Sequence, residues 1–268
     1  MLGAIVGDIV GSIYEFDNIR TKEFPLFGRG CEFTDDSIMS LAVADALTRV
    51  GDTRDEEILK AAFIRSMKRL GKQYPHPMGG YGGRFGMWLF LEESVPYNSW
   101  GNGSAMRVSA CGFAAKSLDD ALELARMSAE VTHNHPEAVA GAQVTAACIY
   151  LARNGKTREE IADYVARTYG ECGLSIAELR ETYRFTERCR DTVPQAIQAF
   201  LEASDFEDAI RNAISIGGDS DTLAAITGGI AEAFFGIPND IRQKARSYLT
   251  PDLLEILDNF EASCGGGK

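Results

Sequence analysis

Two clusters of carboxylate and hydroxyl side chains in this sequence have the composition of cation-binding sites. One cluster is Thr34-Asp35-Asp36-Ser37, and the other is Asp219-Ser220-Asp221-Thr222, directly after two glycines. Each precedes an apolar run typical of a helix, 38–47 in the first case and 223–235 in the second. Such side chains commonly cap helix N-termini, but one cap needs only one of them. The surplus carboxylates are therefore free to act as oxygen ligands.

If the two clusters face each other, their four aspartates bring a formal charge of about −4 into one site. Packing carboxylates together without cations is energetically costly. Two Mg²⁺ or Mn²⁺ ions would neutralise this charge, and ligation by oxygen alone suits these hard ions better than Zn²⁺. The sequence thus predicts a dinuclear metal site at helix N-termini.

The elements that must position these clusters are predicted to be helices, because no stretch alternates with the period of a strand. We expect an all-α fold, a compact orthogonal multi-helix bundle, with residues 1–263 as a single domain and residues 264–268 as a disordered tail. The first helix carries closely spaced glycines that allow close packing. The predicted helices span 1–10, 38–50, 55–70, 87–91, 108–115, 119–132, 136–153, 158–169, 176–187, 194–202, 205–215, 223–235, 238–248 and 251–261.

Composition limits the function classes. The chain has 268 residues, of which 45% are hydrophobic and 25% charged, enough for a sizeable core. The net charge of −12 and the absence of long Lys/Arg runs argue against strong nucleic-acid binding. No apolar run is long enough to span a membrane. The six cysteines form no C-x-x-C pair, which is typical of reduced cytosolic proteins. We expect a cytoplasmic monomer or weak homo-oligomer.

A second candidate site lies in the middle of the chain. The turn Gly101-Asn102-Gly103 introduces a helix, and free N–H groups at a helix start can bind an anion. His133 and His135 share one later turn, where each could cap a helix or donate to phosphate or ribose. Aromatic residues around these loops could stack on an adenine or form a small core of their own; they are Tyr81, Phe85, Tyr97 and Trp100.

Five motifs in order make the pattern specific. They are Gly7-Asp8-x-x-Gly11-x-x-x-Glu15, Thr34-Asp35-Asp36-Ser37, Gly101-Asn102-Gly103-Ser104-Ala105-Met106-Arg107, Thr132-His133-x-His135-Pro136 and Gly217-Gly218-Asp219-x-Asp221-Thr222. Together they resemble the ADP-ribosylglycohydrolase family, typified by the dinitrogenase-reductase-activating glycohydrolase. The resemblance spans essentially the whole chain. It departs from the family pattern at Ser37 and Ser220, where threonine is usual; both positions keep a hydroxyl.

The resemblance implies a site for two Mg²⁺ or Mn²⁺ ions and for ADP-ribose. The implied metal ligands are Thr34, Asp35, Asp36, Asp219, Asp221 and Thr222. The implied substrate-binding residues are those of the loop that would hold the pyrophosphate, Gly101, Asn102, Gly103, Ser104, Ala105 and Met106, together with His133 as a contact to phosphate or ribose. Asp35 and Asp36 are also candidates for the catalytic base, and Glu15 matches a mobile glutamate that gates the site or activates water.

The implied activity is hydrolysis of the bond between ADP-ribose and an acceptor. We expect the partner to be an ADP-ribosylated protein or a small ADP-ribose conjugate, with arginine favoured as acceptor. Serine-linked, ester-type and nucleic-acid conjugates are alternatives, as is a protein that binds ADP-ribose without cleaving it. An isoprenoid-type enzyme fits less well, because its chemistry needs a carboxylate at i+4, where Asp36 has Ser40 and Asp221 has Ala225.

Overall fold

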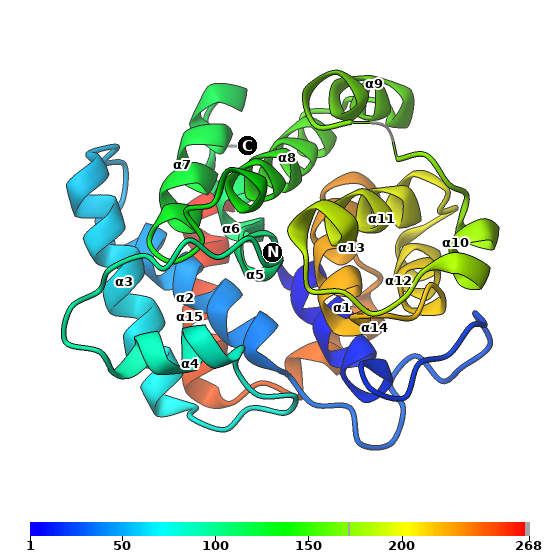
Figure 1. The fold of residues 1–268 in the computed structure, drawn as a ribbon, viewed down its shortest axis with the longest axis horizontal. Helices are drawn as coiled ribbons and strands as arrows, with labels where there is room; N and C mark the ends of the chain where they lie inside the picture. Colours follow the sequence, from blue (N-terminus) through cyan, green and yellow to red (C-terminus); the bar gives the residue numbers. More distant parts are fainter. Residues whose placement is uncertain (171, 266–268) are drawn as a thin grey trace.

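All regular elements that the structure describes are helices. The computed structural model describes residues 1–170 and 172–265, and no β-strand forms within them beyond isolated bridges pairing Thr34 with Met78 and Gly101 with Arg188. The expected all-α fold is confirmed (Figure 1). The helices are α1 (Leu2–Gly11), η1 (Ser12–Tyr14, a 3₁₀ turn), α2 (Asp35–Val50), α3 (Glu56–Gln73), α4 (Gly83–Phe90), α5 (Gly103–Met106), α6 (Ser109–Ala114), α7 (Leu118–Glu130), α8 (Pro136–Arg153), α9 (Arg158–Thr168), α10 (Ile176–Thr182), α11 (Cys189–Leu201), α12 (Phe206–Ser215), α13 (Ser220–Phe235), α14 (Asn239–Arg246) and α15 (Pro251–Gly265).

The centre of the molecule is the pair α1 and α13, which lie side by side (Figure 1). All residues of α1 are buried. A Cβ added at Gly3 would lie 2.2 Å from the carbonyl oxygen of Gly228, and one added at Gly7 would lie 1.9 Å from that of Ala224. Only glycine permits this approach of two backbones. The close packing expected of the first helix is therefore confirmed.

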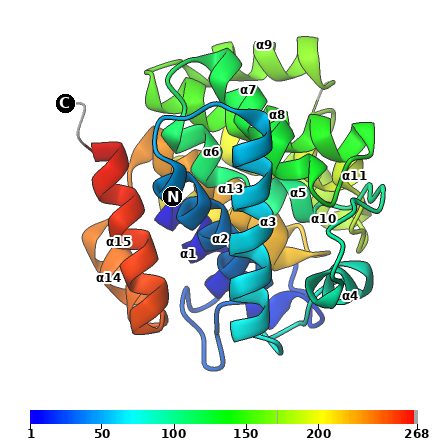
Figure 2. The same cartoon turned by 90° about the vertical axis from the view of Figure 1, so that its left-hand side faces the viewer.

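The other helices cover this pair and fix its surroundings. α2 packs against α1, α3 and α15, whereas α11 and α12 pack against α13. The turned view shows α14 and α15 together along one side of the molecule, away from α4 (Figure 2). None of the described helices has the length and apolar character needed to cross a membrane.

The chain between α10 and α11 differs from the prediction. α10 ends at Thr182 instead of continuing to residue 187, and α11 begins at Cys189 rather than at Pro194. The intervening segment is extended because it pairs with the glycine turn: the Asn102 N–H donates to the Glu187 carbonyl at 2.7 Å, and the Cys189 N–H donates to the Trp100 carbonyl at 3.1 Å. Helical periodicity does not reveal such a pairing between distant segments.

Two further boundaries differ. The predicted helix 108–115 corresponds to α6, Ser109–Ala114, and an additional short helix that was not predicted, α5, precedes it at Gly103–Met106. At the other end of the chain, α15 continues through Cys264 and Gly265, where the predicted disordered tail begins. The half-buried Cys264 side chain packs against the hydrophobic core, which favours the additional helical turn. Residues 266–268 of the predicted tail lie outside the described residues.

Candidate metal centre and substrate cleft

The starts of α2, α4, α5 and α13 converge on a cleft of about 390 Å³. Most of the predicted site residues line it: Glu15, Asp35, Asp36, Gly101, Asn102, Gly103, Met106, His133, Asp219, Asp221 and Thr222. Three others are buried and do not border the cleft: Thr34, Ser104 and Ala105. The Ser104 hydroxyl donates instead to the Ala138 carbonyl at 2.8 Å. The structure therefore brings both acidic clusters and the glycine turn to one cleft.

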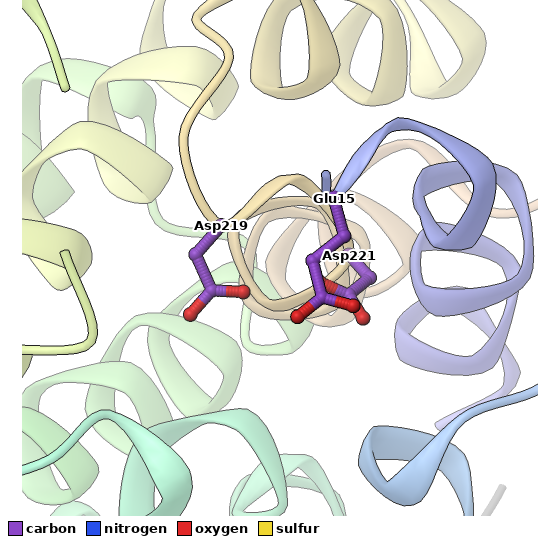
Figure 3. Close-up of side chains that lie close together, drawn as sticks. All are labelled: Glu15, Asp219 and Asp221. Atoms are coloured by element: carbon purple, nitrogen blue, oxygen red, sulfur yellow. The ribbon is translucent and has the colours of Figure 1, made fainter. Parts of the chain in front are cut away.

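The two acidic clusters are in direct contact. Thr222 Oγ1 donates to Asp36 Oδ2 at 3.3 Å, which joins the first turn of α13 to the first turn of α2. Carboxylate oxygens of Glu15, Asp219 and Asp221 lie within 4.8 Å of one another, and all three side chains converge in Figure 3. Asn102 Nδ2 donates to Asp219 Oδ2 at 2.7 Å and so ties the glycine turn to the same cluster.

The start of α2 has both a helix cap and additional carboxylates. Thr34 is the N-cap residue, and its hydroxyl oxygen accepts from the Asp36 N–H at 3.2 Å. α13 has no side-chain cap at Asp219. The carboxylates of Asp35 and Asp36 are thus not needed for capping, as the sequence suggested.

Asp8 is a positioning residue whose role the sequence did not reveal. Its fully buried carboxylate accepts from the Thr34 N–H at 2.9 Å, from Thr34 Oγ1 at 2.7 Å and from the Ser37 N–H at 3.0 Å, and it also accepts from Ser37 Oγ. These bonds attach the start of α2 to α1. In the sequence, Asp8 is a single charged residue in an apolar, glycine-rich helix. This pattern suggests a functional role for Asp8 but does not identify its hydrogen-bond partners.

Burial and mutual repulsion disfavour the ionised carboxylates of the cluster. Burial raises the pKa of Asp36 well above its usual range, and the negative charges of Asp8 and Asp35 raise it further. The pKa values of Asp35 and Asp221 are raised in the same way, first by burial and then by neighbouring aspartates. Burial, followed by the charge of Asp219, raises the pKa of Glu15 to about 7. Within the described part of the chain, these carboxylates have no positively charged partner, which buried carboxylates usually have.

The donor set fits divalent cations. Within residues 1–170 and 172–265, no lysine, arginine or histidine forms an ion pair with the clustered carboxylates. Asp36 Oδ1 is buried and has no hydrogen-bond partner there. A buried, unpartnered carboxylate oxygen among like charges is costly, and clustered hard oxygen donors are the ligands that Mg²⁺ and Mn²⁺ prefer.

The two neighbouring histidines have different surroundings. His135 is the N-cap residue of α8, where its ring nitrogen accepts from the Glu137 N–H at 3.2 Å; this is the capping alternative. His133 is buried in the cleft wall, and its Nδ1 lies 2.8 Å from Thr132 Oγ1. Burial and then the nearby charge of Arg107 lower the pKa of His133 well below its usual range, so the imidazole is neutral.

Of the four aromatic candidates for adenine stacking, three line the cleft and one does not. Tyr97, Trp100 and Phe85 line the cleft, and Trp100 is 49% exposed. Phe85 also stacks on the buried Trp88, with ring centroids 5.5 Å apart. Tyr81 does not border the cleft, and its hydroxyl donates to the Tyr74 carbonyl at 2.9 Å. Trp100 thus offers the most accessible stacking surface of the four.

Three charged residues of the cleft were not predicted. Arg84 and Arg107 contribute positive charge to its wall, and the exposed Glu187 contributes negative charge. The negative charge of Glu187 acts on both Glu15 and Asp219, and it contributes to their raised pKa values. No motif includes Glu187, which lies in the segment predicted to be helical.

A cleft that combines perturbed carboxylates with a few convergent polar groups is typical of an enzyme active site. The sequence model of the ADP-ribosylglycohydrolase family matches residues 1–266. The chain belongs to the ADP-ribosylglycohydrolase family and is a hydrolase, as the resemblance of its motifs predicted. Because the chain belongs to this family, the alternative of an isoprenoid-type enzyme is excluded.

Two curated relatives and one solved structure illustrate the similarity. Human ADP-ribosylhydrolase ARH3 is 26% identical, in an alignment covering 95% of this chain and 90% of the relative. ADP-ribosylarginine hydrolase Tri1 of Pseudomonas putida (strain GB-1) is 27% identical, with 88% and 70% covered. The structure of an ADP-ribosylglycohydrolase-related protein complex has a TM-score of 0.71 at 22% identity, with 100% of this chain and 96% of that chain covered, and supports the fold.

Proposed function

We propose that this hydrolase uses two divalent metal ions, Mg²⁺ or Mn²⁺, to release ADP-ribose from modified arginine side chains of proteins. One observation carries the metal dependence: the cleft floor gathers buried carboxylates that lack positive partners within the described residues, and Asp36 Oδ1 has no hydrogen-bond partner there. Family membership supports the bond that is cleaved.

The proposed metal ligands come from both helix starts, and Glu15 lies beside them. They are Thr34, Asp35, Asp36, Asp219, Asp221 and Thr222. When bound, the two ions would hold the ribose hydroxyls and stabilise charge that develops at the anomeric carbon. Asn102 orients Asp219 through its hydrogen bond, and Asp8 fixes Thr34 and Ser37. These contacts hold the ligands in place before substrate arrives.

Water activation is assigned to a carboxylate of the cluster. Glu15 follows η1 and is only half buried, so its side chain can reach both the cluster and the solvent in the cleft. As a carboxylate, it can accept a proton from the attacking water. The water oxygen then bonds to the anomeric carbon, and the bond to the acceptor nitrogen breaks with its electron pair remaining on nitrogen. The released guanidine takes up the proton that Glu15 accepted. Asp35 and Asp36 are the alternative bases.

The remaining polar groups of the cleft suit the rest of the ligand. The turn at Gly101, Asn102 and Gly103 is the proposed contact for the pyrophosphate, together with Met106 and His133. Ser104 and Ala105 can act there only through their backbone, since their side chains are buried away from the cleft. Trp100 is suited to stack on the adenine.

Arginine is favoured as the acceptor for two reasons. The relative Tri1 is an ADP-ribosylarginine hydrolase. In addition, the exposed Glu187 lies in the cleft within electrostatic range of Glu15, where its carboxylate can pair with the guanidinium of the acceptor. Serine-linked, ester-type and nucleic-acid conjugates remain the alternatives.

The test measures free ADP-ribose released from arginine-linked and serine-linked ADP-ribosylated proteins. It compares the wild type with Mg²⁺, the wild type with EDTA, and the Asp219→Ala Asp221→Ala double variant. We expect release from the arginine-linked substrate only, with Mg²⁺ and without either change. Release that persists in EDTA would contradict the metal dependence, and release from the serine-linked protein alone would contradict the acceptor.

A further inference from the structure

The cleft wall contains a buried positive charge that has no negative partner among the residues the structure describes. The Arg107 side chain is 1% exposed and follows α5. Its Nη2 donates to the Ser128 carbonyl and to Thr132 Oγ1, both at 2.8 Å. Among the described residues no carboxylate pairs with it, and its Nε has no hydrogen-bond partner. A buried charge without a counter-ion destabilises the fold, so its presence here suggests a functional role.

Burial does not remove the charge. It lowers the pKa of Arg107 to about 10, which leaves the guanidinium protonated at neutral pH. The nearby His133 is neutral, and the exposed Arg84 lies elsewhere in the wall of the same cleft. Arg107 is therefore the fixed positive charge of the wall that contains the glycine turn.

Arg107 is connected to His133 by hydrogen bonds. The guanidinium can only donate, so Thr132 Oγ1 accepts from Nη2. The Thr132 hydroxyl proton is then available for His133 Nδ1, which is 2.8 Å away. The positive charge next to Thr132 also favours a lone pair, rather than an N–H, at Nδ1. A neutral imidazole that accepts at Nδ1 carries its proton at Nε2.

His133 Nε2 faces the glycine turn. A Cβ added at Gly103 would lie 2.9 Å from Nε2, and one added at Gly101 would lie 3.7 Å from it. Both glycines and His133 line the cleft. The N–H at Nε2 is therefore directed at the surface that a ligand occupies in this part of the cleft.

We propose that Arg107 is a positioning residue and the fixed counter-charge for the diphosphate of the ADP-ribosyl substrate. Through Thr132 it holds His133 as an Nε2–H donor, and its own unpaired charge balances the phosphates without touching them. This inference rests on the proposed function, because it takes an ADP-ribose compound as the ligand. A purely structural Arg107, which only joins α5 to the end of α7, would affect stability but neither the tautomer of His133 nor ligand affinity.

Four variants separate these roles. Thr132→Val keeps the size of the side chain but removes the link to His133. Arg107→Met removes the charge, and Arg107→Lys keeps it. Ser109→Ala is the matched control, because this buried hydroxyl close in the chain has no hydrogen-bond partner in the described structure and does not line the cleft.

The first readout is the tautomer of His133, measured by long-range ¹H–¹⁵N NMR. The chain has only three histidines, so the signals of His133 are assigned by their loss in His133→Gln. We expect the Nε2–H tautomer in the wild type and Ser109→Ala, and a mixture of tautomers in Thr132→Val. An Nδ1–H tautomer in the wild type would overturn the inference.

The second readout is the affinity for ADP-ribose, measured by calorimetry. We expect Thr132→Val to bind about tenfold more weakly and Arg107→Met about 10- to 100-fold more weakly, with Arg107→Lys between the wild type and Arg107→Met. If Thr132→Val binds ADP-ribose as tightly as Ser109→Ala, the inference is wrong. This comparison tests the inference even if Arg107→Met does not fold. A wild type that neither binds nor releases ADP-ribose would refute the proposed function and this inference with it, whereas unchanged variants of an active wild type would refute only this inference.

Discussion

The contact between α1 and α13 makes Gly7→Ala a sharp test of how the fold sets the site. The added Cβ would lie 1.9 Å from the Ala224 carbonyl oxygen and 2.2 Å from its carbonyl carbon. Both atoms belong to the backbone, so no side-chain rotation can relieve the clash. To reach a separation of 3.0 Å, the two helices must move apart by about 1.1 Å at this point.

This displacement has two expected costs. Overpacking of a core typically costs about 1–3 kcal/mol, and a backbone clash belongs at the upper end of that range. The better helix propensity of alanine returns about 1 kcal/mol, so we expect a net loss of about 2 kcal/mol in the free energy of unfolding. The shift also separates α1 and the following Glu15 from Asp221 on α13. Because Mg²⁺ tolerates only a narrow range of ligand distances, its affinity should fall as well.

Urea unfolding with and without Mg²⁺ measures the first effect, and calorimetric Mg²⁺ titration measures the second. Gly86→Ala is the matched control: it makes the same change inside α4, where the nearest atom to the added Cβ is Tyr81 Cβ at 3.7 Å. This variant should be as stable as the wild type or slightly more so. If Gly7→Ala matched Gly86→Ala in both assays, the reasoning that backbone contact between α1 and α13 sets the spacing of the site would be refuted.

Three further predictions concern single carboxylates. Asp8→Ala leaves the Thr34 and Ser37 N–H groups unpaired, so urea unfolding should show a loss of about 2 kcal/mol or more, and Asp8→Asn a smaller one. In EDTA, the native state binds more protons than the unfolded state because the pKa of Glu15 is raised to about 7 and those of Asp35, Asp36 and Asp221 are raised too. Stability should therefore fall as the pH rises from 5 to 8 and fall less in Glu15→Gln; an unfolding midpoint that rose with pH would contradict this. Glu187→Gln should raise KM about 5- to 10-fold for an arginine-linked substrate and weaken Mg²⁺ binding much less, because Glu187 acts on Glu15 and Asp219 only through its charge; release assays and calorimetry can check both.

The sequence was most informative where residue chemistry is local. The residue types at 34–37 and 219–222 indicated two acidic helix starts, and Asp36 and Thr222 do meet across them. The glycines of the first helix indicated close packing, which the contact with α13 confirms. Such features are visible because a run of hydroxyl and carboxyl groups, or of glycines, is unusual in a helix for simple steric and electrostatic reasons.

The missing parts are those that depend on distant segments. Asp8 is part of the first of the five motifs, but only the fold shows that its carboxylate accepts hydrogen bonds from the start of α2. Glu187 was placed in a helix, whereas pairing with Trp100 and Asn102 extends its segment into the cleft. Arg107 belongs to a recognised motif, yet nothing in the motif says that the guanidinium is buried without a negative partner among the described residues.

One short helix links these observations. α1 presents its glycines to α13 and Asp8 to the start of α2, so both acidic clusters take their positions from the same backbone. Glu15 follows directly after η1 and completes the group with Asp219 and Asp221. Because the clustered carboxylates repel one another when ionised, α1 must hold them together against that repulsion. Substitutions in α1 should therefore weaken stability and metal binding together, whereas substitutions at the exposed Glu187 should change substrate selection far more than either.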